Sequence, residues 1–161
     1  QHLVDAGHTT VWHVAGPAPS YAAERRRAAW ESTLRAAELE PPAVIVGDWT
    51  SASGYAAGLR LREVPGPVAV FAANDEMAYG VMRAFAEAGR SIPEELSIVG
   101  FDDAAASAYM FPPLTTVSQD FTAVGRFAVD AILSTLDGTP APASHLVPTR
   151  LVVRASTAPR R

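Results

Sequence analysis

The stretch VAVFAANDEMAYG, residues 68–80, decides the fold that this sequence predicts. Four consecutive apolar residues, Val68–Phe71, indicate a parallel strand buried on both faces, because a strand with one wet face would alternate. The polar triplet Asn74–Glu76 comes next and can begin the helix predicted over 77–88, which Gly89 can end. A buried strand that runs into a capped helix brings polar side chains to its carboxyl end, where ligands bind in open α/β sheets.

The same alternation of apolar runs and helical patterns continues along the chain. Strands are predicted over 9–15, 43–46, 68–71, 96–99, 115–117 and 146–153, and helices over 21–38, 51–62 (capped by Ser51 or Ser53), 77–88 and 121–136. Residues 104–113 are expected to form a loop or one irregular helical turn, and the arginine- and proline-rich tail is expected to be mobile. Connections of this length predict parallel strands, so the predicted fold class is α/β with a doubly wound parallel sheet.

Composition limits the class of protein. The 161 residues suffice for one domain with a real core, and 48% hydrophobic with 19% charged residues is a globular balance. The formal net charge of −4 gives no general electrostatic reason to hold nucleic acid. The absence of cysteine excludes disulfides and thiolate chemistry and is consistent with a cytoplasmic protein. No apolar run approaches the roughly 20 residues of a membrane helix, so no membrane association is expected.

The basic residues are informative as well. All 13 are arginine, which excludes a Walker-type phosphate lysine and a Schiff-base lysine. The sequence starts at Gln1 in what reads as the tail of a helix, so we expect it to be a piece of a longer chain.

Five polar clusters follow the predicted strands. The alternating topology places them at one rim of the sheet. They are Ser20 with Arg26, Asp48 with Trp49, Asn74-Asp75-Glu76, Asp102-Asp103, and Ser118-Gln119-Asp120.

Each of these residues has a structural and a functional interpretation. Arg26 either packs its stem on Trp30 with its head in water, or aims its guanidinium into a cleft to bind hydroxyls or a carboxylate. Trp49 is either a rim aromatic or a flat face on which a sugar ring stacks. Asn74 is a helix cap, a ligand contact, or both. Asp102 either closes a strand-end turn or accepts hydrogen bonds from two hydroxyl groups of a ligand.

An arginine, a carboxylate, an amide and an indole around one cleft suit a neutral polyhydroxylated ligand. The sequence contains no GxSxG element for a serine nucleophile, and His13 is expected in the core. His2, His8 and His145 lack metal-ligand spacing, and we expect neither a metal nor a cofactor.

Five segments together resemble the sensor domain of lac-repressor-type bacterial transcription regulators, over essentially the whole chain. They are VAGPAPSYAAERRRAAW (14–30), GDWTSASG (47–54), VFAANDEMAYGVMRAFAEAG (70–89), IPEELSIVGFDD (92–103) and FPPLTTVSQDFTAVGRFAVDAIL (111–133). The resemblance implies a two-lobed periplasmic-binding-protein type I fold with an effector between the lobes. Glu76 departs from the family's usual motif and adds a charge near the predicted site.

The resemblance also implies roles for individual residues. The effector contacts carried over by motif are Arg26, Trp49, Asn74 and Asp102, with Ser20, Gln119 and Phe121 more peripheral. The implied dimer contacts are Met77, Val81, Tyr109, Met110 and Phe111. Residues 1–118 would form the C-terminal lobe. Residues 119–161 would form the crossover, a helix of the other lobe and a returning strand, and the helix over 121–136 would expose an apolar face or pack against another copy.

The function expected from this resemblance is effector sensing in a dimeric bacterial repressor. The effector would be a sugar or a similar small molecule, and operator DNA would be contacted only by an N-terminal part outside this sequence. A solute-binding protein of a sugar transport system is the main alternative. An α/β enzyme acting on sugars or phosphates is a third hypothesis. Asp48, Asp102 and Asp103 would be its candidate carboxylates, as Mg²⁺ ligands or as a glycosidase pair.

Overall fold

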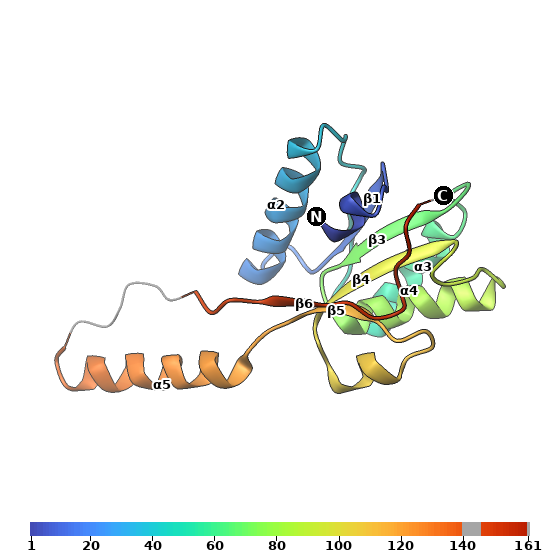
Figure 1. Cartoon of the computed structure of the whole chain (residues 1–161). Helices are drawn as coiled ribbons and strands as arrows, with labels where there is room; N and C mark the ends of the chain where they lie inside the picture. Colours follow the sequence, from blue (N-terminus) through green and yellow to red (C-terminus); the bar gives the residue numbers. More distant parts are fainter. Residues whose placement is uncertain (140–145, 161) are drawn as a thin grey trace.

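A computed structural model describes residues 1–139 and 146–160, which form one α/β unit around a six-stranded sheet (Figure 1). The strand order is β2-β1-β3-β4-β5-β6, with the first five strands parallel and β6 antiparallel to β5. The strands are β1 (Val11–Ala15), β2 (Ile45–Val46), β3 (Val68–Ala72), β4 (Leu96–Asp102), β5 (Thr115–Ser118) and β6 (Arg150–Val152). The predicted fold class and the prediction of a parallel strand at residues 68–71 are therefore confirmed.

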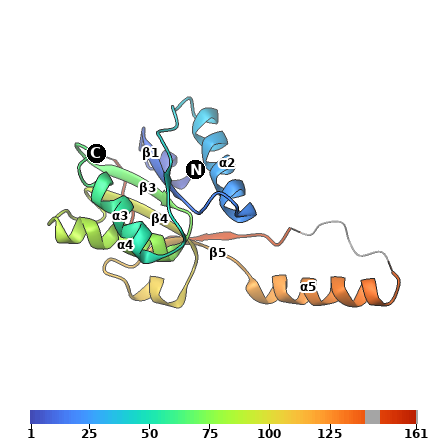
Figure 2. The same ribbon diagram turned by 180° about the vertical axis from the view of Figure 1, so that it is seen from behind.

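Helices cover both faces of the sheet, as a doubly wound fold requires. One face carries α1 (His2–Asp5) and α2 (Tyr21–Ala36), and the other carries α3 (Ser51–Leu61) and α4 (Asp75–Glu87), which Figures 1 and 2 show from opposite sides. The side chains of β3 alternate between the two layers. Val68 and Val70 pack in the α3/α4 layer, whereas Ala69 packs with α1 and α2. Both faces of β3 are thereby buried, which explains its unbroken apolar run.

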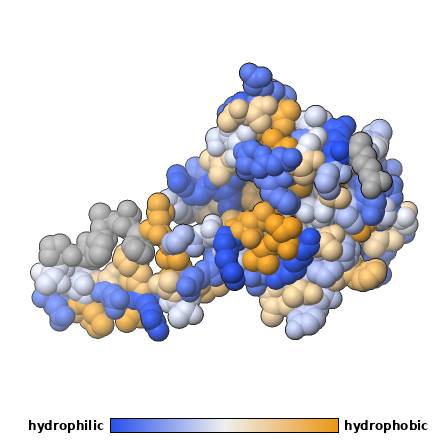
Figure 3. Space-filling model, in the orientation of Figure 1, coloured by the Kyte–Doolittle hydropathy of each residue, from blue (hydrophilic) through white to orange (hydrophobic). Residues whose placement is uncertain are grey.

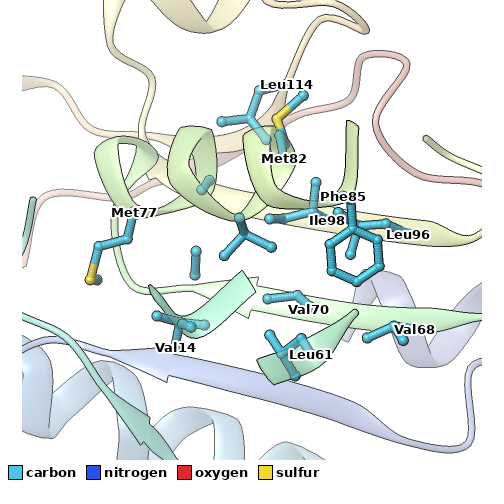
Figure 4. Close-up of a cluster of buried hydrophobic side chains, with 14 of the residues drawn as sticks. Val14, Leu61, Val68, Val70, Met77, Met82, Phe85, Leu96, Ile98 and Leu114 are labelled. Carbon is cyan, nitrogen blue, oxygen red and sulfur yellow. The ribbon is translucent and has the colours of Figure 1, made fainter. Parts of the chain in front are cut away.

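The core between the sheet and α4 is centred on apolar side chains of α4 that are spaced four residues apart in the sequence. Met77, Val81 and Phe85 are each 0% exposed and pack on the sheet (Figure 4). α3 and α4 lie backbone to backbone, because a Cβ added at Gly54 would lie 2.1 Å from the carbonyl oxygen of Met77. An equivalent Cβ on Gly80 would lie 2.0 Å from the Ser51 oxygen. This close approach holds the amino ends of both helices at the same rim.

Local signals account for most helix ends. Asn74 caps α4 by accepting a hydrogen bond from the Met77 backbone at 2.9 Å, and Gly89 closes it at φ 69°. The cap of α3, however, is Thr50, which accepts from the Ser53 backbone at 3.2 Å. The prediction of Ser51 or Ser53 as this cap was wrong by one position or more. The Ser53 hydroxyl instead donates to the Thr50 carbonyl oxygen at 2.9 Å.

The last part of the chain departs from the predicted βαβ pattern. The helix α5 is Phe121–Leu136, as predicted, but none of its side chains is buried and it extends away from the sheet (Figure 1). Because α5 does not cross back over the sheet, the chain returns antiparallel to β5. The strand predicted over 146–153 contracts to β6, and the prediction that its connection forces a parallel strand was wrong.

The C-terminal tail is anchored, which corrects the prediction that it is mobile. Ser156 is 0% exposed, and its carbonyl oxygen accepts a hydrogen bond from the Ile98 backbone at 2.8 Å. The backbone N–H of Arg160 donates to the Ala6 carbonyl oxygen at 2.8 Å. Small polar residues in the tail therefore continue the hydrogen bonding of the sheet. Arg161 lies outside the described residues.

The residues predicted at a dimer contact divide into two groups. Met77 and Val81 are fully buried under α4, so their side chains do not lie on a surface, and their assignment was wrong. Tyr109 and Phe111, at the end of the short 3₁₀ helix η1 (Ala105–Tyr109), are 88% and 97% exposed, and Met110 packs partly on the core. Packing against the sheet explains the helical spacing of Met77 and Val81.

α5 has more exposed large apolar residues than any other described helix, and Figure 3 shows apolar atoms among polar ones along it. Its exposed apolar residues are Phe121, Val124, Val129, Ile132, Leu133 and Leu136. Within the described residues, no helix is both long and apolar enough to cross a membrane.

Candidate functional site

The candidate site lies at the carboxyl rim of the sheet, where β1, β3, β4 and β5 end. Residues from all five predicted polar clusters meet there, through hydrogen bonds or ring contacts. The residues brought together are Arg26, Trp49, Asn74, Asp102 and Gln119. This convergence follows from the parallel order of the strands.

Arg26 projects from α2 across the ends of the strands rather than into solvent. Its Nη1 donates to the Ala73 carbonyl oxygen at 2.5 Å, and its Nη2 lies 3.4 Å from Asp102 Oδ1. The guanidinium stacks on Phe101, with 3.7 Å from Cζ to the ring centroid, and Trp49 lies at 5.7 Å. The guanidinium therefore points inwards to Asp102 and not into solvent. Burial lowers the pKa of Arg26, opposed by the charge of Asp102.

Asp102 is the carboxylate of this network. Its Oδ1 accepts from Gln119 Nε2 at 2.8 Å as well as from Arg26. Burial raises the pKa of Asp102, and the charge of Asp75 adds to this, whereas Arg26 and Gln119 act in the opposite direction. The side chain is still 32% exposed, so one side of the carboxylate remains accessible. Asp102 can thus accept hydrogen bonds from a ligand at the rim.

Trp49 is held in an unusual position by close backbone packing. Its φ is 76°, and its indole lies against the backbone of Gly16, where an added Cβ would lie 2.3 Å from the ring. Asn74 fixes the loop, because its Nδ2 donates to the Trp49 carbonyl oxygen at 2.9 Å while its Oδ1 caps α4. Asn74 is 8% exposed, so it acts as a cap and as a support for Trp49.

Asp75 connects three elements behind the rim. Its Oδ1 accepts from Thr116 Oγ1 at 2.5 Å. Its Oδ2 accepts from Ser107 Oγ at 2.6 Å and from the Ala104 backbone at 2.8 Å. Asp75 is 1% exposed, so it supports the structure behind the rim and does not face a ligand. Sequence reasoning missed its partners, because they come from a distant strand and from η1.

Other predicted residues lie at the edges of the site. Ser20 caps α2, accepting from the Ala23 backbone at 3.3 Å, and Phe121 is 59% exposed at the start of α5. Asp48 is exposed and binds its own loop through Thr50, outside the central network.

Two acidic residues near the rim are engaged elsewhere. Glu76 accepts from the Ser51 hydroxyl at 2.6 Å between the starts of α3 and α4. Asp103 pairs with Arg154 at 2.7 Å, an interaction that sequence reasoning missed. Its pKa is lowered overall, since hydrogen bonds from Arg154 and Ser118 and the charge of Arg154 outweigh the effect of burial.

An apolar groove of about 740 Å³ adjoins the rim between α2 and the sheet. Arg26, Phe101 and Gln119 form part of its lining, together with Trp30 and Val99. Its surface is mainly apolar, and it contains neither Asp102 nor Trp49. The polar rim, rather than this groove, has the hydrogen-bonding groups that a hydroxylated ligand needs.

Among the described residues, no group of three or more His, Asp or Glu side chains is arranged to hold a metal ion. His13 is 0% exposed and stacks between Trp30 and Phe71, as expected for a core residue. Burial lowers its pKa to about 4. Burial also lowers the pKa of His8, which contacts the Ala158 carbonyl oxygen. His145 lies outside the described residues.

Comparison with known families defines the class of this domain. Residues 1–157 match the family described as periplasmic binding protein-like domain. The chain therefore belongs to the periplasmic binding protein-like domain family.

Individual relatives are transcription regulators. The chain is 39% identical to the lactose operon repressor of Escherichia coli over 158 residues, which cover 98% of this chain and 44% of that repressor. It is 33% identical to the ribose operon repressor of Escherichia coli over 136 residues, covering 83% of this chain and 41% of the relative. The chain thus spans less than half the length of these curated relatives.

Solved structures agree with these relationships. A lac repressor dimer bound to operator and the anti-inducer ONPF matches 98% of this chain and 55% of its own, with a TM-score of 0.91 and 39% identity. A sugar-binding regulator of the LacI family from Enterococcus faecalis matches 96% of this chain and 58% of its own, with a TM-score of 0.89 and 32% identity. The chain is homologous to LacI-family regulators over nearly its whole length.

Proposed function

We propose that this chain is the effector-binding part of a bacterial transcriptional repressor and that a neutral sugar or similar polyol binds at the carboxyl rim. The observation that carries the proposal is the network of Arg26, Asp102 and Gln119 beside the indole of Trp49. The names of the relatives support a regulator over a transport protein, and they include no enzyme.

The charges at the rim favour a neutral ligand. The positive charge of Arg26 faces the negative charge of Asp102 at 3.4 Å, so the pair has no excess charge for a phosphate or a free carboxylate. Hydroxyl groups can accept from the guanidinium and donate to the carboxylate at the same time. Trp49 adds a flat apolar face against which a sugar ring can stack. The position of Arg26 over Phe101 keeps this arrangement formed before a ligand arrives.

The proposed mechanism is a shift between two arrangements of lobes. Residues 1–118 would form one lobe, and residues 119–161 the crossover, a helix of the second lobe and the returning strand. The exposed apolar face of α5 supports this division, because such a surface is normally covered. An effector that binds one arrangement more tightly changes operator affinity, with a coupling of about 1–3 kcal/mol.

The proposed partners are a second copy of the chain and operator DNA. Tyr109 and Phe111 are largely exposed and offer apolar anchors for a homodimer. With a net charge of −4, this domain has no general attraction to DNA, so a DNA-binding segment outside it would make the operator contact. Such a regulator would act in the cytoplasm, where the DNA is.

A panel of neutral sugars tests the ligand class. Titration calorimetry with D-ribose, D-galactose, lactose, maltose and cellobiose is expected to give saturable binding for at least one of them. Glucose 6-phosphate is expected to bind at least about tenfold more weakly than the best neutral sugar, because Asp102 opposes a second negative charge. Stronger binding of the phosphorylated sugar would contradict the proposed ligand class.

Asp102→Asn tests the site itself. The amide keeps one acceptor but loses the negative charge, so the affinity for the bound sugar should fall about tenfold or more. Burial raises the pKa of Asp102, so its contribution to stability decreases as the pH rises towards neutrality, and the variant should not be destabilised at pH 7. Asp48→Asn, at an exposed carboxylate outside the network, is the control and should leave the affinity unchanged. Equal effects of both substitutions would remove Asp102 from the site.

A further inference from the structure

The turn after β4 is held by contacts from several parts of the chain. Asp102 belongs to the rim network described above. Asp103, the next residue, pairs with Arg154 from the segment that follows β6. The backbone N–H of Ala104 donates to Asp75 Oδ2 at the start of α4. Each of three consecutive residues is therefore fixed from a different direction.

This turn has a backbone conformation that needs such support. Asp102 has φ 111° and Asp103 has φ 55°, so two adjacent non-glycine residues lie at positive φ. Positive φ is uncommon for residues with a Cβ, and it persists only where the surroundings fix it. The direction of the Asp102 carboxylate depends on this backbone, since the side chain leaves the chain at the strained residue.

The contacts of Arg154 hold Asp103 in place. Its Nη2 lies 2.7 Å from Asp103 Oδ1, and the two side chains are 19% and 20% exposed. Its Nη1 donates to the Leu114 carbonyl oxygen at 2.7 Å, and its backbone N–H donates to Thr115 Oγ1 at 2.9 Å. The guanidinium therefore joins the β4 turn to the start of β5 while its own backbone is tied to the sheet.

We infer that Arg154 is a positioning residue for effector binding: through Asp103 it holds the β4 turn so that the Asp102 carboxylate faces the ligand. The inference rests on the proposed sugar site at this rim. Arg154 follows β6, which returns from the α5 side, so the position of the returning strand and the direction of Asp102 are mechanically linked. A shift of this strand would change effector affinity without touching the ligand.

The primary test needs no ligand. In Arg154→Met, amide hydrogen exchange of residues 101–105 is expected to rise about tenfold or more, while exchange of residues 68–72 in β3 stays unchanged. The control is Arg83→Met, which removes an arginine from a surface ion pair with Glu87 and should change the global stability little. This control should leave exchange at 101–105 unchanged, and Arg154→Lys should restore part of the protection.

Two results would overturn the inference. One is unchanged exchange at residues 101–105 in Arg154→Met. The other is equal acceleration in β3, which would mean a general loss of stability. If Arg154→Met does not fold, Asp103→Asn removes the same ion pair from the other side and should give the same local increase.

Binding of the best sugar from the panel gives the second readout. Arg154→Met should weaken that affinity about tenfold, and adding it to Asp102→Asn should weaken it no further, because Arg154 acts through Asp102. Additive losses would contradict the inference. If the wild-type chain binds no sugar of the panel, the proposed ligand class fails, while the exchange result still decides whether Arg154 positions the turn.

Discussion

Two arginines with similar surroundings serve the two ends of the sheet differently. The side chains of Arg26 and Arg90 are each 15% exposed, and each guanidinium stacks on a phenylalanine ring. Arg26 lies 3.4 Å from Asp102 at the carboxyl end, and Arg90 lies 3.3 Å from Glu95 beyond the C-terminus of α4. Burial and charge alone do not distinguish the two residues.

The hydrogen bonds distinguish them. Arg90 donates to three backbone carbonyl oxygens in the loop 62–66 as well as to Glu95, which fixes the guanidinium from several sides. Within the described residues, Arg26 donates only to the Ala73 carbonyl oxygen and, at a long distance, to Asp102. The protein itself satisfies Arg90, whereas Arg26 has fewer acceptors among the described residues, which agrees with the proposed ligand contact. A buried arginine therefore indicates binding only where its donors are left incomplete.

The largest predicted effect concerns His13, which is 0% exposed in the core and is neutral in the folded protein near pH 7. Its pKa is lowered from 6.5 to about 4, so the unfolded chain binds more protons between these values. The contribution of neutral, buried His13 to the free energy of unfolding is therefore expected to be fully present above about pH 6.5. The free energy of unfolding should fall by about 3 kcal/mol as the pH drops to 4. Urea unfolding at a series of pH values measures this loss. His13→Phe keeps the ring stack and should remove this loss from the plot of unfolding free energy against pH. An unchanged loss in the variant would show that His13 does not cause it.

Arg90→Met should have the next largest effect. Several carbonyl groups lose a charged donor, so the free energy of unfolding is expected to fall by about 2–3 kcal/mol. Sugar affinity, measured by calorimetry, should stay the same, since Arg90 lies away from the rim. Arg83→Met is the control, because Arg83 is 71% exposed in a surface pair with Glu87, and it should cost less than about 0.5 kcal/mol.

Arg26→Met should show the opposite profile. Loss of the guanidinium donors is expected to weaken sugar binding about tenfold or more. The free energy of unfolding should change by less than about 1 kcal/mol, because Asp102 keeps Gln119 as a donor and has access to water. If Arg26→Met destabilises the domain as much as Arg90→Met and leaves binding intact, the distinction between the two arginines is wrong.

Gly16→Ala should have the smallest of these effects. The added methyl group would overlap the indole of Trp49, which is partly exposed and can move outwards. Sugar affinity is expected to fall about threefold to tenfold, with a change of less than about 1 kcal/mol in stability. Gly125→Ala, in the open surface of α5, is the control for affinity and should leave it unchanged, while helix propensity raises the stability by up to about 1 kcal/mol. Equal affinity of Gly16→Ala and wild type would separate Trp49 from the site.

Much of the fold was predictable because its signals are local. The unbroken apolar run at 68–71 and the helical spacing of Met77, Val81 and Phe85 each record burial against the sheet. The family resemblance, in contrast, led to a wrong assignment of Met77 and Val81 to a dimer surface, although both are 0% exposed in the core. A periodic apolar face shows that residues are buried, but it does not show whether the partner is the same chain or another.

The candidate site was partly predictable for a topological reason. Parallel strands place their carboxyl ends together, so Arg26, Trp49, Asn74 and Asp102 could be grouped without coordinates. The contacts that hold these residues in place could not be predicted from strand order. Asp75 meets Thr116 and Arg154 meets Asp103 across 41 and 51 positions of sequence, and no periodicity relates such residues.

The sequence by itself determined the α/β class, the order of the elements and the set of polar residues at the rim, because hydrophobic period and capping act over a few residues. Tertiary structure alone decided that β6 runs antiparallel and that the tail is anchored through Ser156. It also decided that Arg90 finds more hydrogen-bond acceptors for its guanidinium group than Arg26 does. These outcomes depend on which distant groups meet, and hydrogen bonds between distant groups are fixed by three-dimensional packing rather than by local pattern.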